Sequence, residues 1–259
     1  MSGYLKPPGS TLFYYIIGAY IIEERTKSIR DGMIFANLQH NYNLIQGRID
    51  QASSRSCRSP SQIRLVVVTK NHPVETVQAL IDMGITDIGE NRVQEIEKKI
   101  PHLHGNFIMH MIGHLQTNKA AKVITLVKWI QSIDSIRLIE KILAVPNVVN
   151  RKIKVLVEVN TSGEPSKSGC NPDECRMLAE KIASSGILEF RGLMTIGPVR
   201  MDETSTRISF SLLRRLGEQC KDLASSIELS MGMSSDFEWA LAEGATIVRI
   251  GSLLVGSRE

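Results

Sequence analysis

This chain of 259 residues has few cysteines and few aromatic residues, and neither sign of charge is in large excess. It has four cysteines without a CxxC pair or a zinc-ligand spacing, so we expect reduced thiols, as in a cytosolic protein, and no disulfide framework. Aromatic residues make up 5% of the chain, and the net charge is only +4. Because basic residues are spread along the sequence without an aromatic-interleaved stripe, the composition gives no indication of nucleic-acid binding.

Long apolar runs are also missing, since a membrane span needs about 20 residues. The compact apolar run at residues 11–22 is too short, and it lacks the basic start and cleavage site of a secretory signal. We interpret residues 1–32 as an N-terminal extension, disordered or used in targeting, and residues 33–259 as the folded domain. A membrane-touching anchor and an organelle-targeting segment are the alternatives for the extension. We expect a cytoplasmic protein without a membrane partner.

The folded domain opens with an amphipathic pattern over residues 33–50. Its apolar residues recur at alternating spacings of three and four, which predicts a helix with one buried face. These residues are Phe35, Leu38, Tyr42, Ile45 and Ile49.

Strand and helix patterns then alternate to the end of the chain. The predicted strands lie at residues 65–70, 87–89, 107–112, 127–133, 153–159, 191–196, 229–231 and 246–250. Helical patterns separate them, for example after Pro73 and at residues 117–124, 172–185 and 204–225. Eight such steps in about 200 residues fit a single (β/α)8 barrel of the TIM type better than an open doubly wound sheet. Little chain remains for an eighth helix, so we hypothesise that the helix at 33–50 packs on the barrel in its place.

Lys70 ends the first predicted strand, an apolar and β-branched run that is typical of a strand buried on both faces. Active sites of such barrels lie at the carboxyl ends of the strands. A partly desolvated lysine amine can form a Schiff base with an aldehyde, which arginine cannot do. The alternative is that Lys70 merely leads a solvated loop.

The ends of strands seven and eight contain the sharpest local signal. Residues 232–238 read as a glycine turn entering a helix, with Ser235 and Glu238 spaced as a capping box. Gly251 and Ser252 follow strand eight, and barrels often bind phosphate in this corner. The alternative is that these serines only cap helices.

Arg249 lies within strand eight, where an inward-facing charge must meet an anion or an acceptor. One interpretation is a salt bridge to a core carboxylate. The other is an arginine that faces the ring nitrogen of pyridoxal phosphate (PLP). His110 and His114 lie on a strand with no third ligand spaced to match, so we expect no metal site.

Seven motifs in order carry a resemblance to a known family over residues 33–257. They are VVTK (67–70), IGENRVQE (88–95), HMIGHLQTNK (110–119), VNTSGE (159–164), RGLMTIG (191–197), SMGMSSD (230–236) and VRIG (248–251). They resemble the pyridoxal phosphate homeostasis proteins, also described as alanine racemase N-terminal-domain-like. The chain departs from the family pattern at Met109 and at residues 71–72, on the rim of the expected site.

The resemblance implies a PLP-binding barrel of fold type III in which Lys70 forms the aldimine. It further implies that Ser234, Gly251 and Ser252 hold the phosphate, that Arg249 faces the pyridine nitrogen, and that Asn91, Asn160 and Met194 line the pocket. The implied function is intracellular PLP homeostasis by a carrier without efficient turnover, so no catalytic residue is assigned. We expect a monomer whose partners are PLP and amino acids.

A PLP-dependent amino-acid racemase is the alternative function. Racemisation needs a base on each face of the substrate α-carbon, but all five tyrosines lie at or before Tyr42, ahead of the predicted barrel. A Schiff-base aldolase without a cofactor would explain Lys70 but leave Arg249 without a role.

Overall fold

The computed structural model describes residues 10–146, 152–200 and 202–256, with side chains from residue 32 onward. The strands are β1 (Arg64–Val68), β2 (Asp87–Glu90), β3 (Ile108–Met111), β4 (Trp129–Ile133), β5 (Ile153–Glu158), β6 (Leu188–Met194), β7 (Glu228–Ser230) and β8 (Ile247–Ile250). The α-helices are α1 (Ser10–Arg55), α2 (Val74–Asp82), α3 (Val93–Lys99), α4 (Ala120–Leu126), α5 (Ile136–Leu143), α6 (Cys175–Ala183), α7 (Glu203–Gln219), α8 (Phe237–Ala242) and α9 (Ser252–Val255). Short 3-10 helices are η1 (Pro60–Gln62), η2 (Ile100–His102), η3 (Thr117–Lys119), η4 (Pro172–Glu174) and η5 (Lys221–Leu223).

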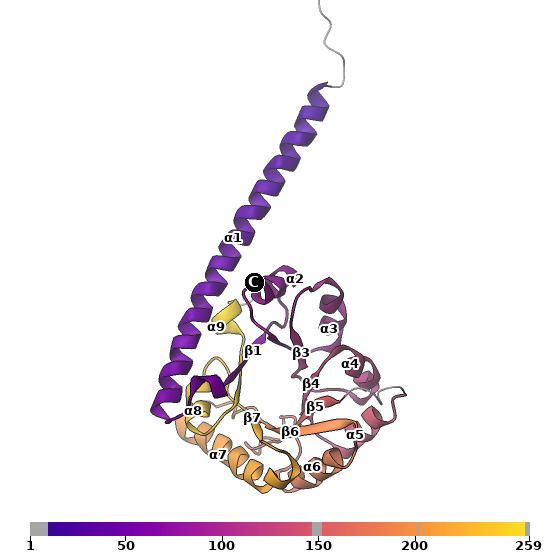
Figure 1. Ribbon diagram of the computed structural model, residues 1–259, viewed down its shortest axis with the longest axis vertical. Helices are drawn as coiled ribbons and strands as arrows, with labels where there is room; N and C mark the ends of the chain where they lie inside the picture. Colours follow the sequence, from indigo (N-terminus) through magenta and orange to yellow (C-terminus); the bar gives the residue numbers. More distant parts are fainter. Residues whose placement is uncertain (1–9, 147–151, 201, 257–259) are drawn as a thin grey trace, which may run out of the picture.

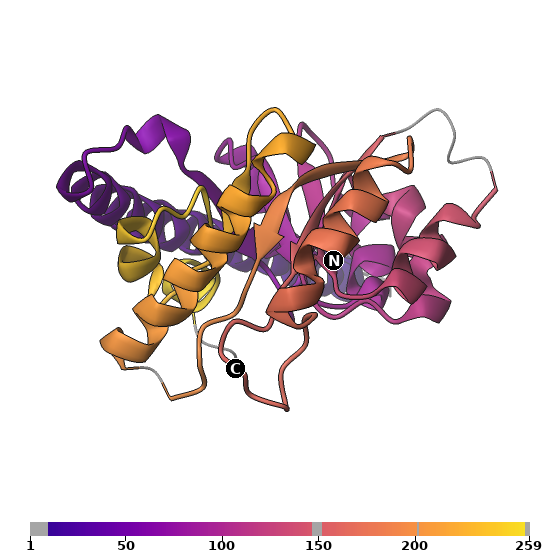
Figure 2. The same ribbon diagram turned by 90° about the horizontal axis from the view of Figure 1, so that it is seen from below.

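The strands form a closed parallel barrel in sequence order, and β1 pairs with β8 to close it. Figure 1 looks along the barrel and shows the strands at the centre of a ring of helices. In Figure 2 the helices α5, α6 and α7, coloured from pink to orange, follow one another along the outside of the barrel. The predicted (β/α)8 architecture is therefore confirmed.

Two apolar layers account for this architecture. A large core lies between the strands and the helices, because each helix turns one apolar stripe inward. A small cluster fills the inside of the barrel and consists of Val66, Trp129, Leu156, Met194 and Ile247. Since side chains alternate along a strand, both faces of each strand are buried, and polar residues inside the barrel must bond to one another.

Helix α1 packs on the barrel beside α8, α9 and α2, as hypothesised. The Asn41 side-chain amide donates to the Leu254 carbonyl at 2.9 Å, and Arg48 pairs with Glu238 at 3.0 Å. The helix begins at Ser10, however, whereas the sequence pattern predicted a start at Met33. Its first part projects away from the barrel (Figure 1).

Strand boundaries differ from the prediction by a few residues. Strand β1 ends at Val68, so Lys70 lies in the turn that follows, although the Thr69 amide still donates to the Gly89 carbonyl at 3.1 Å. Among the described residues, no helix is long and apolar enough to cross a membrane.

Candidate functional site

The carboxyl ends of β1, β7 and β8 enclose a cavity of about 480 Å³. Five of the eight predicted site residues line this cavity, one after the first strand and four near the last two strands. They are Lys70, Ser234, Arg249, Gly251 and Ser252. The pairing of β1 with β8 explains this, because Val67 lies opposite Ile250 in the register. Barrel closure thus brings together residues about 180 positions apart.

Lys70 reaches this cavity from a tight turn. The amide of His72 donates to the Thr69 carbonyl at 3.0 Å, and Asn71 between them adopts a left-handed conformation with φ of 62°. Asparagine tolerates this conformation better than most residues do. The turn reverses the chain before α2 begins and leaves Lys70 half-buried at the barrel mouth.

Gly232 directly precedes the loop whose residues Met233, Ser234 and Ser235 line the cavity. Its φ of 91° suits glycine, and a Cβ atom there would lie 2.8 Å from the Cα of Phe237. The predicted capping box of Ser235 and Glu238 is wrong, because α8 begins at Phe237 with Asp236 as its N-cap residue. The Asp236 carboxylate instead accepts from the Met233 amide at 2.6 Å and so braces the loop that contains Ser234.

Arg249 points into the barrel and is almost completely buried. Its guanidinium donates to the Ser230 hydroxyl at 2.6 Å and to the Thr195 carbonyl at 2.8 Å. No carboxylate among the described residues forms a salt bridge with it. Burial lowers the pKa of Arg249 to about 10, and attraction to Glu158 and Asp236 opposes the shift. The side chain is therefore still a cation at neutral pH.

A chain of buried hydrogen bonds continues from Arg249 through the barrel. Ser230 donates to the Gln131 carbonyl oxygen at 2.6 Å, and the Gln131 amide lies 3.0 Å from Nδ1 of His110. Nε2 of His110 lies 3.0 Å from Asp87. Burial lowers the pKa of His110, so its ring is neutral at pH 7. Because the Gln131 amide must donate, Nδ1 accepts, Nε2 bears the proton, and every bond in the chain runs from Arg249 toward Asp87.

Asp87 ends this chain as a carboxylate. It also accepts from Arg64 at 2.8 Å and from the Thr86 hydroxyl at 2.7 Å. Burial opposes its ionisation, but the hydrogen bonds from His110, Thr86 and Arg64 outweigh burial and hold its pKa well below the usual range. Both ring nitrogens of His110 are thus engaged, and no group of three metal-ligating side chains occurs in the described part of the chain.

Glu158 is a second buried acid and, unlike Asp87, it lies at the carboxyl end of its strand, β5. Burial and repulsion from Asp134 raise its pKa to about 7, although Arg249 attracts the charged form. Its Oε2 atom has no hydrogen-bond partner among the described residues. Sequence reasoning missed both Glu158 and Gln131, and the available signal was a polar residue inside an otherwise apolar strand.

Three predicted residues lie outside the cavity of Lys70. Asn91 lines a neighbouring cavity of about 530 Å³. Asn160 bonds within its own loop, donating to the Glu164 carbonyl at 2.9 Å and accepting from the Gly163 amide at 3.0 Å. Met194 is buried inside the barrel.

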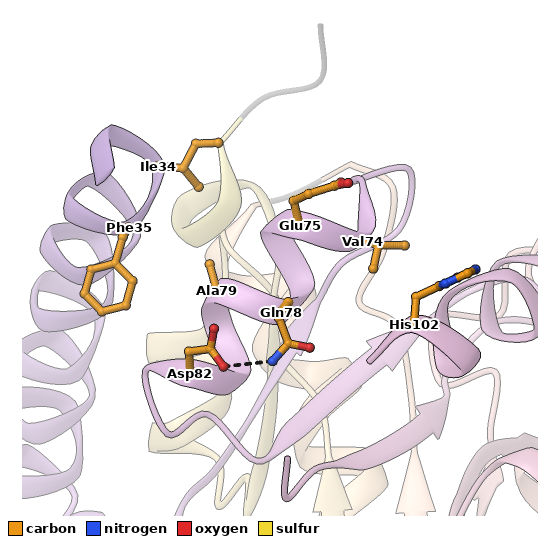
Figure 3. Close-up of a pocket in the computed structure, with 8 residues that line it drawn as sticks. All are labelled: Ile34, Phe35, Val74, Glu75, Gln78, Ala79, Asp82 and His102. Atoms are coloured by element: carbon orange, nitrogen blue, oxygen red, sulfur yellow. Dashed lines mark hydrogen bonds between the residues drawn. The ribbon is translucent and has the colours of Figure 1, made fainter. Parts of the chain in front are cut away.

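A separate cavity of about 660 Å³ lies outside the barrel wall, between α1 and α2 (Figure 3). Ile34 and Phe35 of α1 face Ala79 and Asp82 of α2 across it. It contains none of the predicted site residues, so the cavity at Lys70 is the stronger candidate for chemistry.

The chain is similar to known proteins over most of its length. The family described as "Alanine racemase, N-terminal domain" matches residues 35–259. A pyridoxal phosphate homeostasis protein from Homo sapiens is 40% identical over 235 aligned residues, which cover 83% of this chain and 84% of that protein. The chain belongs to the pyridoxal phosphate homeostasis protein family. A second member, from Aquifex aeolicus, is 38% identical and covers 82% of this chain and 94% of its own length.

Solved structures of similar proteins include PipY of Synechococcus elongatus with PLP bound. It is 31% identical, has a TM-score of 0.70, and covers 81% of this chain and all of its own (100%). A protein of unknown identity from Bifidobacterium adolescentis is 37% identical, with a TM-score of 0.79 and coverage of 86% and 96%. Alanine racemase from Corynebacterium glutamicum shares the fold at 13% identity and a TM-score of 0.68, covering 86% of this chain and 62% of its own.

Proposed function

We propose that this chain binds PLP covalently through Lys70 and carries it for PLP homeostasis in the cytoplasm. The observation that carries the proposal is the convergence of an amine, three serine hydroxyls and a buried cation on one cavity of about 480 Å³. The binding of PLP by PipY, a relative of 31% identity, supports it. Free thiols at Cys57, Cys170, Cys175 and Cys220 are in keeping with a reducing compartment.

The residues at the cavity fit the chemistry of the cofactor. PLP supplies an aldehyde that condenses with a primary amine and releases water, and Lys70 is the lysine that lines this cavity. Ser234 and Ser252 offer hydroxyls to a phosphate, and Gly251 lines the cavity beside Ser252. Asn91, Asn160 and Met194 are assigned to the surrounding wall.

Arg249 favours a carrier over an enzyme. Its pKa of about 10 keeps it protonated at neutral pH, so it would donate a hydrogen bond to a ring nitrogen of bound PLP and would keep its own proton. A ring held in this way is a weak electron sink. No tyrosine follows Tyr42, so the barrel offers no tyrosine base for racemisation.

Substituting Lys70 tests the proposal directly. We expect Lys70→Ala to abolish the borohydride-trapped PLP adduct while the circular dichroism spectrum and thermal unfolding stay as in the parent, because Lys70 lies in a turn outside the barrel core. Intact-protein mass spectrometry after trapping measures the adduct. Lys122→Ala, an exposed lysine on α4, is the matched control and should retain the full adduct.

The same preparations distinguish the carrier from the racemase. The PLP-loaded parent is incubated with single enantiomers of amino acids in deuterated water, and chirality and deuterium are followed together. A carrier gives at most slow α-deuteration without inversion. Rapid formation of the opposite enantiomer by the parent, lost in Lys70→Ala, would establish the racemase instead, and an adduct of unchanged mass in Lys70→Ala would disprove the assignment of Lys70.

A further inference from the structure

A buried cluster of three charged residues lies directly behind the Lys70 turn. Its centre is Lys99, the last residue of α3, whose ammonium group donates to Glu90 at 2.6 Å and to Glu95 at 3.1 Å. The Lys99 side chain is 7% exposed and that of Glu90 is 0% exposed. The third donated bond of Lys99 goes to the backbone carbonyl of Thr69 at 2.9 Å.

All three members of the cluster hold the chain on either side of Lys70. On one side, Lys99 binds the Thr69 carbonyl, and Glu90 accepts from the Thr69 hydroxyl at 2.6 Å. On the other side, Glu95 accepts from the Asn71 amide at 2.7 Å. The peptide groups that flank Lys70 are thus tied to α3 and β2.

The conformation of Asn71 explains why such ties are needed. A non-glycine residue at φ of 62° is uncommon and persists where its surroundings fix it. The bond from its amide to Glu95 supplies this constraint. A turn held only by its internal bond from His72 to Thr69 could rotate and carry the Lys70 amine away from the cavity.

The electrostatics of the cluster suit positioning more than stability. Burial raises the pKa of Glu90, and its Oε2 atom has no hydrogen-bond partner among the described residues. Burial also acts against ionisation of Glu95, but the hydrogen bonds from Asn71 and Lys99 lower its pKa. Buried ion pairs commonly stabilise a fold no better than apolar residues of similar size. Directional bonds to the Lys70 turn are what an apolar cluster could not provide.

We infer that Glu90, Glu95 and Lys99 are positioning residues that hold the Lys70 amine at the mouth of the barrel. The inference deepens the proposed function and rests on it for the role of Lys70. The cluster acts through the backbone of residues 69–71 and does not itself contact the reacting atoms.

Two variants remove ties to the Lys70 turn: Thr69→Val changes little in shape, whereas Glu95→Ala also removes the bond from Lys99. Thr69→Val deletes the hydroxyl bonded to Glu90, and Glu95→Ala deletes the acceptor of the Asn71 amide. We expect both to speed hydrogen–deuterium exchange of segment 69–73 in the cofactor-free protein. In the PLP-loaded protein we expect cofactor release to a PLP-binding trap to quicken about tenfold, as for the loss of about 1.4 kcal/mol. Thr69→Ser, which restores the hydroxyl, should return both values toward the parent.

Two controls separate positioning from general loss of stability. Lys98→Met changes the exposed neighbour of Lys99 on the same helix, and Ile142→Ala destabilises the buried face of α5 at a distance from the site. Both should release PLP at the parental rate. Parental release by Thr69→Val and Glu95→Ala, or fast release by Ile142→Ala at matched stability, would overturn the inference. A parent that binds no PLP would instead refute the proposed function, and segment exchange would still show whether the cluster holds the turn.

Discussion

The two principal residues of the site are held in place by different kinds of polar network. Lys70 depends on a charged cluster outside the barrel wall, in which Lys99 bonds to two carboxylates. Arg249 depends on a chain inside the barrel whose middle members, Ser230, Gln131 and His110, are neutral. The first network fixes a backbone turn, whereas the second fixes a side chain.

The difference follows from what each residue offers its neighbours. In the proposed function Lys70 offers its amine to an aldehyde, and the cluster holds the peptide groups on either side of it. Arg249 has five N–H donors and can give two of them to Ser230 and Thr195 without losing its role as a donor at the cavity. A flexible amine is thus held by its backbone, and a planar guanidinium is held by its own hydrogen bonds.

Breaking the interior chain should have the largest effect on stability. Gln131→Leu leaves Nδ1 of His110 buried without a partner and the Ser230 hydroxyl without an acceptor for its proton, although Arg249 still donates to the Ser230 oxygen. We expect unfolding to become easier by about 4 kcal/mol, at about 1–3 kcal/mol per unsatisfied group. Urea denaturation measures this change. Lys70 should still form its trapped adduct with PLP, because the Lys99 cluster is intact.

Ser132→Ala is the matched control for this variant. Ser132 is the buried neighbour of Gln131 on β4, and its hydroxyl has no hydrogen-bond partner among the described residues, so its loss should leave stability nearly unchanged. Loss of the adduct in folded Gln131→Leu would show that the two networks are not independent.

Glu158 allows the comparison to be sharpened through pH. Its pKa is about 7 in the folded protein and near 4.5 in the unfolded chain, so the folded state retains a proton that the unfolded state releases. The contribution of Glu158 to stability is therefore fully present below pH 4.5 and is lost as the pH rises through 7. We expect Glu158→Gln to gain stability relative to the parent over this interval, by at most about 3 kcal/mol at 1.36 kcal/mol per pKa unit.

Chemical denaturation of Glu158→Gln and the parent at several pH values measures this gain. The exposed Glu140→Gln on α5 is the control and should follow the parent at every pH. A stability difference that stays flat from pH 4.5 to pH 8 would show that Glu158 is already ionised in the folded protein.

The smallest effect is expected at the phosphate corner, which neither network supports. Ser252→Ala removes one exposed hydroxyl, and the loss of one hydrogen bond to a charged group is worth about 1.5 kcal/mol, or a roughly tenfold weaker retention of PLP. Equilibrium dialysis measures retention, and the trapped adduct should still form at high PLP concentration. Ser61→Ala, which removes an exposed serine hydroxyl of η1, serves as the control. Unchanged retention in Ser252→Ala would place the phosphate elsewhere in the cavity.

The barrel could be predicted from the sequence because its strands are β-branched runs separated by amphipathic helices. The start of α1 could not, since the pattern of one apolar face begins only at Met33, while the helix begins at Ser10. The convergence of Lys70, Ser234 and Arg249 followed from the order of strands in a closed barrel. The positions of Asn91, Asn160 and Met194 around that cavity are predictions that depend on side-chain directions at the mouth.

The supporting networks were beyond sequence reasoning for a physical reason. A polar residue within a buried strand indicates that a hydrogen-bond partner is needed, but it does not indicate which residue that partner is. The partner of Gln131 is Ser230, 99 positions away. The burial of Lys99 was easier to predict, because Lys99 follows Val93 and Ile96 at a spacing of three on the buried face of α3. A lysine on an apolar stripe indicates a buried ion pair, whereas its neighbour Lys98 faces solvent.

The hydrogen-bond chain behind Arg249 has a consequence for proton movement. A carboxamide holds its two hydrogens tightly and does not take up a third, so Gln131 cannot hand a proton from Ser230 to His110. The chain is therefore no proton wire, even though its bonds all run in one direction. Gln131 therefore blocks proton transfer in the middle of the barrel. Asp87, at the opposite end of the chain, helps to orient Arg249 but cannot exchange protons with it.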